Sequence, residues 1–278
     1  MRLGIHIPLK GGFAANLMRV KEYGCETVQF FPGNPTGWKM AAPKLEEIAG
    51  RAALAREQSI YPLIIHSAYL INLATRSADF HEKSVRLLDE TMVRASLHEA
   101  PFVVLHTGNH GGAGVEQGLE QVAETIAGSL PGWPGEVKLL LENTAGSGTA
   151  LGSTFEELAR VLRNFPPGEL GVCLDTAHGW AAGYDFGSAD GVKELLEQFE
   201  RLIGLEHLTA LHLNDAKVAR GSRVDRHEHI GQGQIGLEGL QELLRQPWPE
   251  KMPAVLETPE IGSEWDRLNL EKIRSMLD

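Results

Sequence analysis

The chain has 278 residues, of which 42% are hydrophobic and 23% are charged, and its formal net charge is −11. This composition is ordinary for a globular protein with a sizeable core, and it excludes a disordered chain. No apolar run approaches the roughly 18 residues of a membrane span, so we expect a cytoplasmic protein that does not contact a membrane. The acidic balance argues against a nucleic-acid partner, but bound divalent cations would make one face positive, so charge alone does not exclude DNA.

Short aliphatic and β-branched runs alternate along the chain with longer amphipathic segments. We predict eight strands, at residues 3–8, 27–32, 62–69, 102–108, 138–144, 170–178, 210–216 and 254–259. Segments of helical period lie between them, including 44–57, 83–99, 154–163, 191–202 and 237–244. Buried strands that alternate with helices predict one α/β domain over residues 1–278, a (β/α)8 TIM barrel.

Two further features fit this barrel. Cys25 and Cys173 lie within apolar segments, and two cysteines cannot form a disulfide framework, so we interpret both as core residues. The longest irregular stretches, 33–43, 108–118 and 217–236, all follow predicted strands. In a parallel barrel, the loops after the strands form the functional face.

Metal-binding residue types stand where the predicted strands end. Strands three to eight and the loop after strand seven supply His66, His106, Glu142, Asp175, His178, His212, Asp225, His227 and Glu257. One such residue is more often a core side chain bonded to backbone, but six consecutive strands that share this feature predict a metal centre at the C-terminal face. Imidazole with carboxylate suits zinc, manganese or iron, and the histidines favour Zn²⁺, with Mn²⁺ or Fe in some sites. Nine ligands exceed the roughly four that one zinc takes and fit two to three ions per chain.

Spacing divides some of these ligands among the ions. Asp225 and His227 are two residues apart, so in an extended chain they point the same way and fit one ion. Asp175 and His178 are three apart, which in an extended strand places them on opposite faces. We therefore expect this second pair to serve neighbouring ions.

At this point the motifs carry a family resemblance. The relevant strings are HSAYLINLA, LHTGNH, LLLENTAGSG, GVCLDTAHGWAAGYD, HLNDAK, GSRVDRHEHIGQGQIG and VLETP. They resemble the endonuclease IV family of apurinic/apyrimidinic endonucleases, and they occur in the family's order. The resemblance implies a zinc-dependent deoxyribonuclease of DNA repair. Such an enzyme cuts damaged double-stranded DNA 5′ to abasic sites and trims blocked 3′ ends.

The resemblance also implies how the ligands are shared. It assigns His66, His106 and Glu142 to a first metal, with Glu142 bridging to a second. The second metal would also take Asp175, His212 and Glu257, and the third would take His178, Asp225 and His227. Glu142 and Glu257 would be the catalytic carboxylates beside the attacking water.

Candidate DNA contacts lie in the loops of the same face. Trp38 and Tyr69 are placed to stack on DNA, although aromatic side chains also cap barrel mouths. The loop around Asp225 carries four cations that would hold backbone phosphates, with a solvated charged loop as the alternative. These cations are Lys217, Arg220, Arg223 and Arg226.

The sequence departs from the family pattern in two loops. HTGNH stands where the family usually has HPGSH, so the loop after His106 is expected to differ in shape. Thr36 and Gly37 stand before the tryptophan, where the family typically has an Arg-Gln pair that enters the duplex at the lesion. We therefore expect an intact metal site with weakened recognition of intact duplex.

Two other functions remain open. A sugar isomerase or epimerase of the related barrel family would use only Glu142, Asp175, His212 and Glu257. A noncatalytic DNA-damage binder would fit the altered loop. The remaining ligands have no role in a single-metal isomerase site and favour the nuclease, and a complete ligand set argues against lost chemistry. We expect a monomer.

Overall fold

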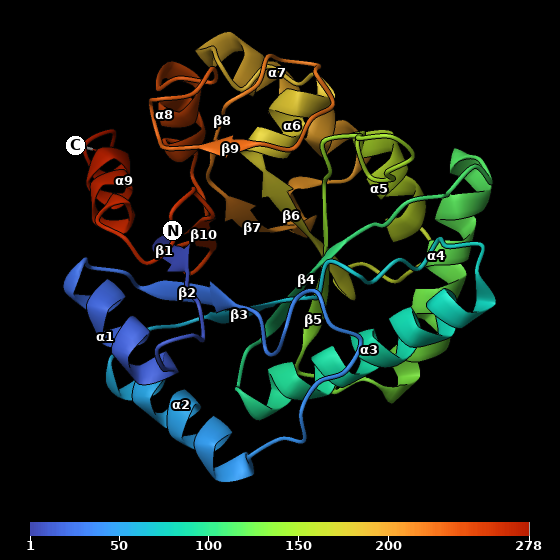
Figure 1. The fold of residues 1–278 in the computed structure, drawn as a ribbon. Coiled ribbons are helices and arrows are strands. Elements are labelled where there is room, and N and C mark those ends of the chain that lie inside the picture. Colours follow the sequence, from blue (N-terminus) through green and yellow to red (C-terminus); the bar gives the residue numbers. More distant parts are fainter. Residues whose placement is uncertain (278) are drawn as a thin grey trace.

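Eight short apolar segments pair side by side as parallel strands and close into a barrel in the computed structural model, which describes residues 1–277 (Figure 1). Around the barrel the order is β1-β10-β7-β6-β5-β4-β3-β2. The strands are β1 (Arg2–His6), β2 (Thr27–Phe30), β3 (Leu63–His66), β4 (Phe102–His106), β5 (Lys138–Glu142), β6 (Leu170–Asp175), β7 (Leu208–His212) and β10 (Pro253–Leu256). This confirms the predicted TIM barrel.

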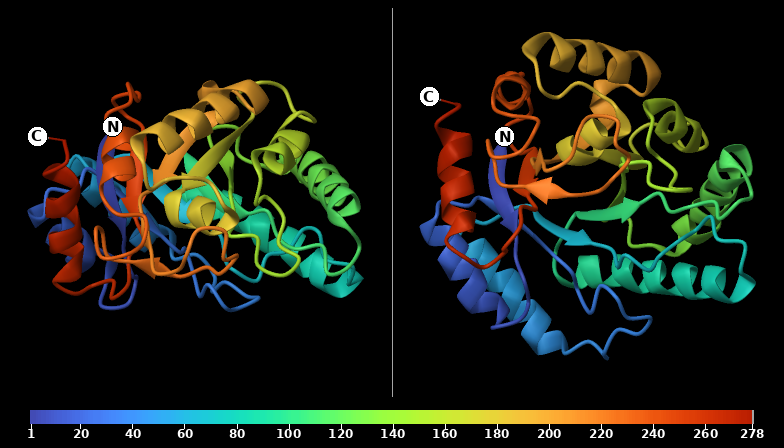
Figure 2. Two further views of the ribbon diagram at one scale, coloured as in Figure 1. Left: turned by 90° about the horizontal axis from the view of Figure 1, so that it is seen from above. Right: turned by 45° about the horizontal axis from the view of Figure 1, so that its top comes forward.

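Helices surround the strands on the outside (Figure 2). They are α1 (Phe13–Glu22), α2 (Leu45–Glu57), α3 (Ala78–Leu97), α4 (Val115–Ser129), α5 (Phe155–Leu162), α6 (Thr176–Ala182), α7 (Ala189–Leu202), α8 (Glu238–Leu244) and α9 (Trp265–Arg274), with short 3-10 turns η1 (Leu130–Gly132) and η2 (Leu205–His207). The last helix, α9, packs near β1, so the two ends of the chain meet at the seam of the ring. Within residues 1–277, no helix has the length and apolar character that a membrane crossing requires.

A small core cluster fills the inside of the barrel. It consists of Ile64, Val104, Leu140, Cys173, Ala210 and Val255, one from each of six strands. Side chains two positions further along a strand point to the same side. The residues two positions after these six are His66, His106, Glu142, Asp175, His212 and Glu257. The candidate ligands therefore form the next layer of the barrel interior, towards its C-terminal mouth.

All eight strands end earlier than predicted, and for two of them hydrogen bonds explain the difference. The prediction of a strand to residue 178 is wrong, because the Asp175 carboxylate accepts the His178 N–H at 2.7 Å and starts α6 at Thr176. The prediction of a strand to residue 216 is also wrong. The Thr176 hydroxyl bonds both backbone groups of Asn214, and Asp215–Ala216 (β8) then pairs antiparallel with His227–Glu228 (β9).

Both cysteines are buried free thiols, as predicted. Cys173 belongs to the cluster inside the barrel, and Cys25 belongs to the larger core between the barrel and its helices.

Candidate metal centre

Glu142, at the end of β5, is the centre of the polar layer. Its Oε2 atom lies 3.2 Å from His66 Nε2 and 3.1 Å from His106 Nε2. Its Oε1 atom lies 3.2 Å from His178 Nδ1 and 3.0 Å from His212 Nδ1. The carboxylate is 0% exposed, so four imidazoles from four different elements converge on one buried anion.

The ligand atoms gather into three groups, each with all its atoms within 4.8 Å of one another. The groups are His66, His106 and Glu142; Asp175, His178 and His227; and Glu142, Asp175, His212 and Glu257. Glu142 and Asp175 each belong to two groups, so the three groups form one continuous cluster.

Asp225 lies at the edge of this cluster. Its carboxylate oxygens are 3.3 Å from His178 Nε2 and 3.5 Å from His227 Nε2, and half of its side chain is exposed. The Asp225 and His227 side chains therefore lie close together, as expected if they point the same way. Neither residue belongs to a strand of the barrel.

The expectation for Asp175 and His178 is wrong in its geometry. Because α6 begins at Thr176, three positions is close to one helical turn and brings the two side chains to the same side. The His178 Nδ1 and Asp175 Oδ1 atoms are 3.8 Å apart, and both residues belong to the group that includes His227.

Hydrogen bonds fix which nitrogen of several histidines is free. His66 Nδ1 lies 2.7 Å from the Ser67 carbonyl oxygen, and His227 Nδ1 lies 2.9 Å from the Glu257 carbonyl oxygen. An oxygen acceptor requires the proton on Nδ1, so Nε2 of the neutral ring carries a lone pair directed into the cluster.

His212 is fixed in the same way, but here Nε2 is the outer nitrogen and Nδ1 is the nitrogen that faces the cluster. Its Nε2 lies 2.9 Å from Gln29 Oε1, and its Nδ1 faces oxygens of Glu142 and Glu257 at 3.0 and 3.1 Å. A lone pair that faces carboxylate oxygens is repelled unless a proton or a metal ion stands between them. This arrangement, with the outer nitrogen bonded to an oxygen, is the one that metal-ligating histidines adopt.

The charge balance points the same way. Among residues 1–277, no lysine or arginine pairs with Glu142, Asp175 or Glu257; their ionic neighbours are all histidines. His227 Nε2 is a buried atom with no hydrogen-bond partner in the described chain. Buried carboxylates with imidazole lone pairs around them fit divalent cations.

The pKa values of Glu142 and His178 show how strongly the buried carboxylates stabilise positive charge on the neighbouring imidazoles. Burial opposes ionisation of Glu142, but His106 and His212 outweigh it and hold the pKa of this carboxyl well below its usual range. Burial likewise opposes protonation of His178, but Asp175, Asp225 and Glu142 raise its pKa well above the usual value. Since ligands must give up their protons to bind a metal, a divalent cation would replace this proton charge.

Two residues of the polar layer escaped the sequence analysis. His6 Nδ1 lies 3.1 Å from Glu257 Oε1, and the Gln29 amide donates to the same oxygen at 2.6 Å. His6 is the last residue of β1, but the predicted first strand ran to residue 8 and placed it in the interior of the strand, and Gln29 is not a usual metal ligand. Applying the two-residue period from Gly4 and Thr27 would have found them, because it places His6 and Gln29 in the same layer.

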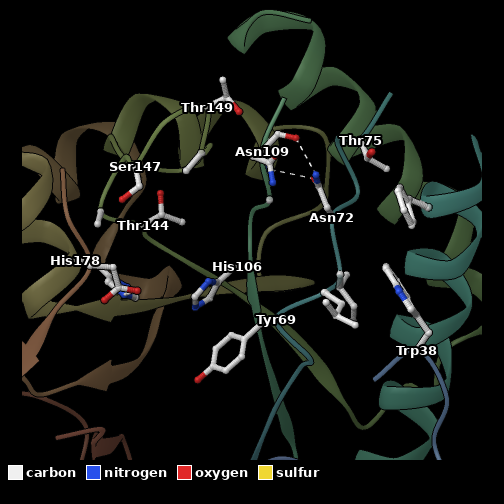
Figure 3. A pocket seen from close by; sticks show the side chains of 17 residues that line it. Trp38, Tyr69, Asn72, Thr75, His106, Asn109, Thr144, Ser147, Thr149 and His178 are labelled. Carbon is white, nitrogen blue, oxygen red and sulfur yellow. Dashed lines mark hydrogen bonds and ion pairs between the residues drawn. The ribbon is translucent and has the colours of Figure 1, made fainter. Parts of the chain in front are cut away.

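The predicted aromatic contacts stand beside the cluster. Trp38 and Tyr69 line a cavity of about 530 Å³ together with His106, His178 and Asp225. Figure 3 shows Tyr69 beside His106, with Trp38 and His178 at opposite ends of the cavity. Tyr69 is 57% exposed, and Trp38 stacks on an exposed phenylalanine of α3, Phe80, with ring centroids 5.8 Å apart. An aromatic wall thus adjoins the polar cluster.

The four predicted basic contacts are all exposed on the 217–236 loop. Arg220 pairs with Asp185 at 2.9 Å, and Lys217 lies 4.0 Å from Glu228. Arg226 donates to the carbonyl oxygen of Asp225, while the backbone carbonyl of Arg223 accepts from a serine hydroxyl of the neighbouring loop. The structure therefore places these cations on the loop that carries Asp225, with two of them partly engaged by carboxylates.

The 33–43 loop has an ordered tip. Asn34 Oδ1 accepts hydrogen bonds from the backbone N–H and the hydroxyl of Thr36, at 3.1 and 3.0 Å. The Pro35 carbonyl accepts from the Tyr69 N–H at 3.1 Å, which ties this loop to the next one. Thr36 and Gly37 therefore occupy a fixed turn in front of Trp38.

Comparison with known proteins now identifies the class of this barrel. A family model described as a xylose isomerase-like TIM barrel matches residues 17–277. A relative from Natranaerobius thermophilus named probable endonuclease 4 is 40% identical over 280 residues, covering 100% of this chain and 98% of the relative. The crystal structure of endonuclease IV from Thermus thermophilus is 35% identical with a TM-score of 0.87, covering 100% of this chain and 99% of the other.

The chain belongs to the endonuclease IV family, within the xylose isomerase-like barrels, as its motifs predicted. The crystal structure of a D-tagatose 3-epimerase-like protein superposes with a TM-score of 0.75 over 100% of this chain and 97% of the other at 18% identity, which shows a shared fold alone.

Proposed function

We propose that this chain is a metal-dependent phosphodiester hydrolase that cuts damaged double-stranded DNA on the 5′ side of abasic sites and trims blocked 3′ ends. The observation that carries the proposal is the convergence of all nine predicted ligand residues at one end of the barrel. The names of the relatives, which are endonucleases, support the same substrate class.

The proposed metal ligands follow two of the three groups, and in the remaining group Asp225 takes the place of Asp175. One ion would be held by His66, His106 and Glu142, a second by Glu142, Asp175, His212 and Glu257, and a third by His178, Asp225 and His227, with zinc as the predominant metal. When bound, zinc acts as a Lewis acid that lowers the pKa of water and offsets the negative charge of a phosphate.

Glu257 is the proposed catalytic carboxylate at the rim of the cluster. Hydrogen bonds from Gln29 and His6 hold its Oε1 atom at 2.6 and 3.1 Å, and Oε2 lies 3.1 Å from His212 Nδ1. Its pKa stays well below the usual range, because the charges and hydrogen bonds of His212 and His6 outweigh burial. An ionised, fixed carboxylate beside the cluster can orient the attacking water and accept its proton.

Glu142 is the second proposed catalytic carboxylate. It is completely buried, and its two oxygens are shared among four imidazoles. We assign it the task of setting the positions of the imidazoles around the reacting phosphate, because replacing its charge would disturb all four contacts together.

DNA would be held by the loops around this cluster. Trp38 and Tyr69 offer aromatic faces for stacking next to His106, and stacking of this kind tolerates any base. The basic side chains of the 217–236 loop are placed to contact backbone phosphates on the other side of Asp225.

A sugar epimerase is the second candidate, because Glu142, Asp175, His212 and Glu257 form a self-sufficient group. The five further residues around it favour the nuclease, since one metal cannot use them. A noncatalytic DNA-damage binder is the third candidate, and the complete ligand set speaks against it.

The test is cleavage of a duplex that carries one abasic analogue, with and without a chelator, alongside an epimerase assay on a ketohexose. We expect a single product cut 5′ to the lesion, loss of cleavage with the chelator, and recovery on addition of zinc. Epimerised sugar without strand cleavage would refute the proposal in favour of the second candidate.

A further inference from the structure

A second cavity, of about 360 Å³, lies beside the 33–43 loop and shares no lining residue with the cavity of the metal centre. Its walls come from the chain after β1 and β2, the first half of α2, and the C-terminal end of α3. The loop separates the two cavities: Trp38 lines the cavity at the metal centre, and its neighbour Lys39 lines this one. The second cavity therefore adjoins the loop of the metal-centre cavity but lies outside the site already described.

The walls of this cavity are cationic on an acidic protein. Four cationic side chains line it, Lys39, Lys44, Arg51 and Arg94, against one carboxylate, Glu47. The whole chain has a net charge of −11, so this concentration of positive charge is local. Glu47 pairs with Arg51 and lies 3.6 Å from Lys44 Nζ, and Arg94 pairs with Glu90, so the four cations face two carboxylates.

Arg94 is the most deeply placed of these cations. It is buried, and its guanidinium donates to the Ala41 carbonyl and, at 3.2 Å, to Glu90. Both bonds use Nη2, and within the described chain no bond uses the other guanidinium nitrogens. A planar guanidinium with free donors matches the oxygens of a phosphate.

His98 supplies an unpartnered buried atom in the same wall. It is 1% exposed, and its Nδ1 lies 2.8 Å from the Arg94 carbonyl oxygen, so Nδ1 carries the proton. The Nε2 atom has no hydrogen-bond partner among residues 1–277. Burial lowers the pKa of His98, and the charges of Arg51 and Arg94 act in the same direction. Nε2 of this neutral ring therefore carries a lone pair and can only accept a hydrogen bond, so a protonated phosphate can be its partner, whereas a phosphodiester oxygen cannot.

We propose that this cavity is a phosphate-binding site, in which Lys39, Lys44 and Arg94 hold the anionic oxygens and His98 lines the wall beside them. The nearer source is a DNA backbone phosphate, because the wall between the two cavities is the loop that carries Trp38. That source rests on the proposed nuclease function. The chemistry of the site also suits free phosphate, and the experiment separates the two sources.

The first arm measures how DNA binding depends on salt. The variant Lys39→Gln/Lys44→Gln removes two exposed charges from the cavity, and Lys193→Gln/Lys251→Gln removes two exposed charges elsewhere as the matched control. Binding of an undamaged duplex to the zinc-loaded protein is followed by fluorescence anisotropy from low to moderate salt. We expect the slope of log K against log salt to fall by about 0.9 for each lost phosphate contact in the first variant, and to stay unchanged in the control.

The second arm uses inorganic phosphate as the probe, with the His98 imidazole nitrogens observed by NMR in the zinc-loaded protein. A saturable shift of the Nε2 signal that weakens in Lys39→Gln/Lys44→Gln, without a change in the DNA salt slope, would assign the site to free phosphate. An unchanged Nε2 signal together with a salt slope that is the same in the variant and the control would overturn the proposal. Neither arm depends on cleavage, so a protein without nuclease activity would still reveal the phosphate site.

Discussion

The site has a floor, formed by the side chains at the ends of the barrel strands, and a mouth, formed by the loops around them. These two regions are built in different ways. On the floor, Glu142 is 0% exposed and is surrounded by four imidazoles, and His6 and Gln29 hold Glu257 from behind. At the mouth, Tyr69 is 57% exposed, and the basic residues of the 217–236 loop project into solvent. The strands thus position the proposed ligand and catalytic residues, whereas the loops determine which substrate reaches them. Changes on the floor should therefore damage the chemical step, and changes at the mouth should alter binding.

The largest effect is expected from the floor carboxylates. Glu257→Gln should lower the single-turnover rate by about 10²–10⁴, because a positioned acid–base group is worth that much. Glu142→Gln should have a similar effect, because the loss of its charge disturbs the four imidazoles around it. His178→Ala should lose less, since His178 lies beside the partly exposed Asp225. The measurement is single-turnover cleavage of an abasic duplex at matched metal occupancy. Equal losses in all three variants would show that the roles are wrongly divided.

Metal removal should come next. Elemental analysis of protein purified without chelator should report two to three equivalents of metal per chain, mostly zinc. Because the metal binds the folded chain, removing it should lower stability by about 4 kcal/mol at a thousandfold excess over Kd, or roughly 8–16 °C in Tm. One equivalent per chain would contradict the trinuclear proposal and favour the epimerase.

A smaller loss is expected at the base of the mouth, where Asp215 anchors the long loop. Its buried carboxylate accepts N–H groups of Ala216, Gly231, Gly233 and Ile235, at 2.8 to 3.0 Å. Asp215→Ala should destabilise the fold by about 3 kcal/mol, because buried donors would lose their partner. It should also reduce metal retention at His227, on the same loop.

The control for Asp215 is Asp190→Ala, whose side chain is 92% exposed. Thermal unfolding and metal content of the two variants should be compared side by side. A stable Asp215→Ala protein with full metal content would show that the loop is held by other contacts.

At the tip of the mouth, Thr36→Arg/Gly37→Gln should strengthen binding to an intact abasic duplex. Unstacking a lesion is costly, and longer side chains would offset part of it. We expect KM to fall about tenfold with little change in kcat, the pattern of uniform binding, and no gain on a nicked, 3′-blocked duplex. A side chain at Gly37 would meet Asn34 Nδ2 at 3.1 Å, so Thr36→Arg alone is the control that avoids this contact. Equal gains on both substrates would contradict this interpretation.

The smallest response should come from the thiols of the interior. Burial raises the pKa of Cys25 and Cys173 to about 12, so both remain protonated thiols near pH 8. A thiol reagent added to the native protein should therefore label neither, and denaturant should expose both. Rapid labelling of Cys173 in the native state would contradict this expectation, because it would mean that the barrel interior opens readily to solvent.

The barrel and most of its floor could be predicted from the sequence alone. Period-two strands alternating with period-3.6 helices are a local property of the backbone, so they reveal the fold class and the ligands that end strands three to eight. His66, Glu142 and His212 stand two residues after apolar interior side chains, and that spacing alone predicts that they point inward.

Which side chains meet depends on the tertiary structure. The N-terminal cap at Asp175, which turned a predicted strand into α6, depends on geometry at one residue, and it reversed the expected relation of Asp175 to His178. His6 and Gln29 reach Glu257 across more than 220 residues of sequence, through the pairing of β1 with β10 and of β1 with β2. The cavity around His98 likewise joins α2, α3 and two loops. Such contacts arise only when the ring closes, because no local periodicity records the distance between residues far apart in the chain.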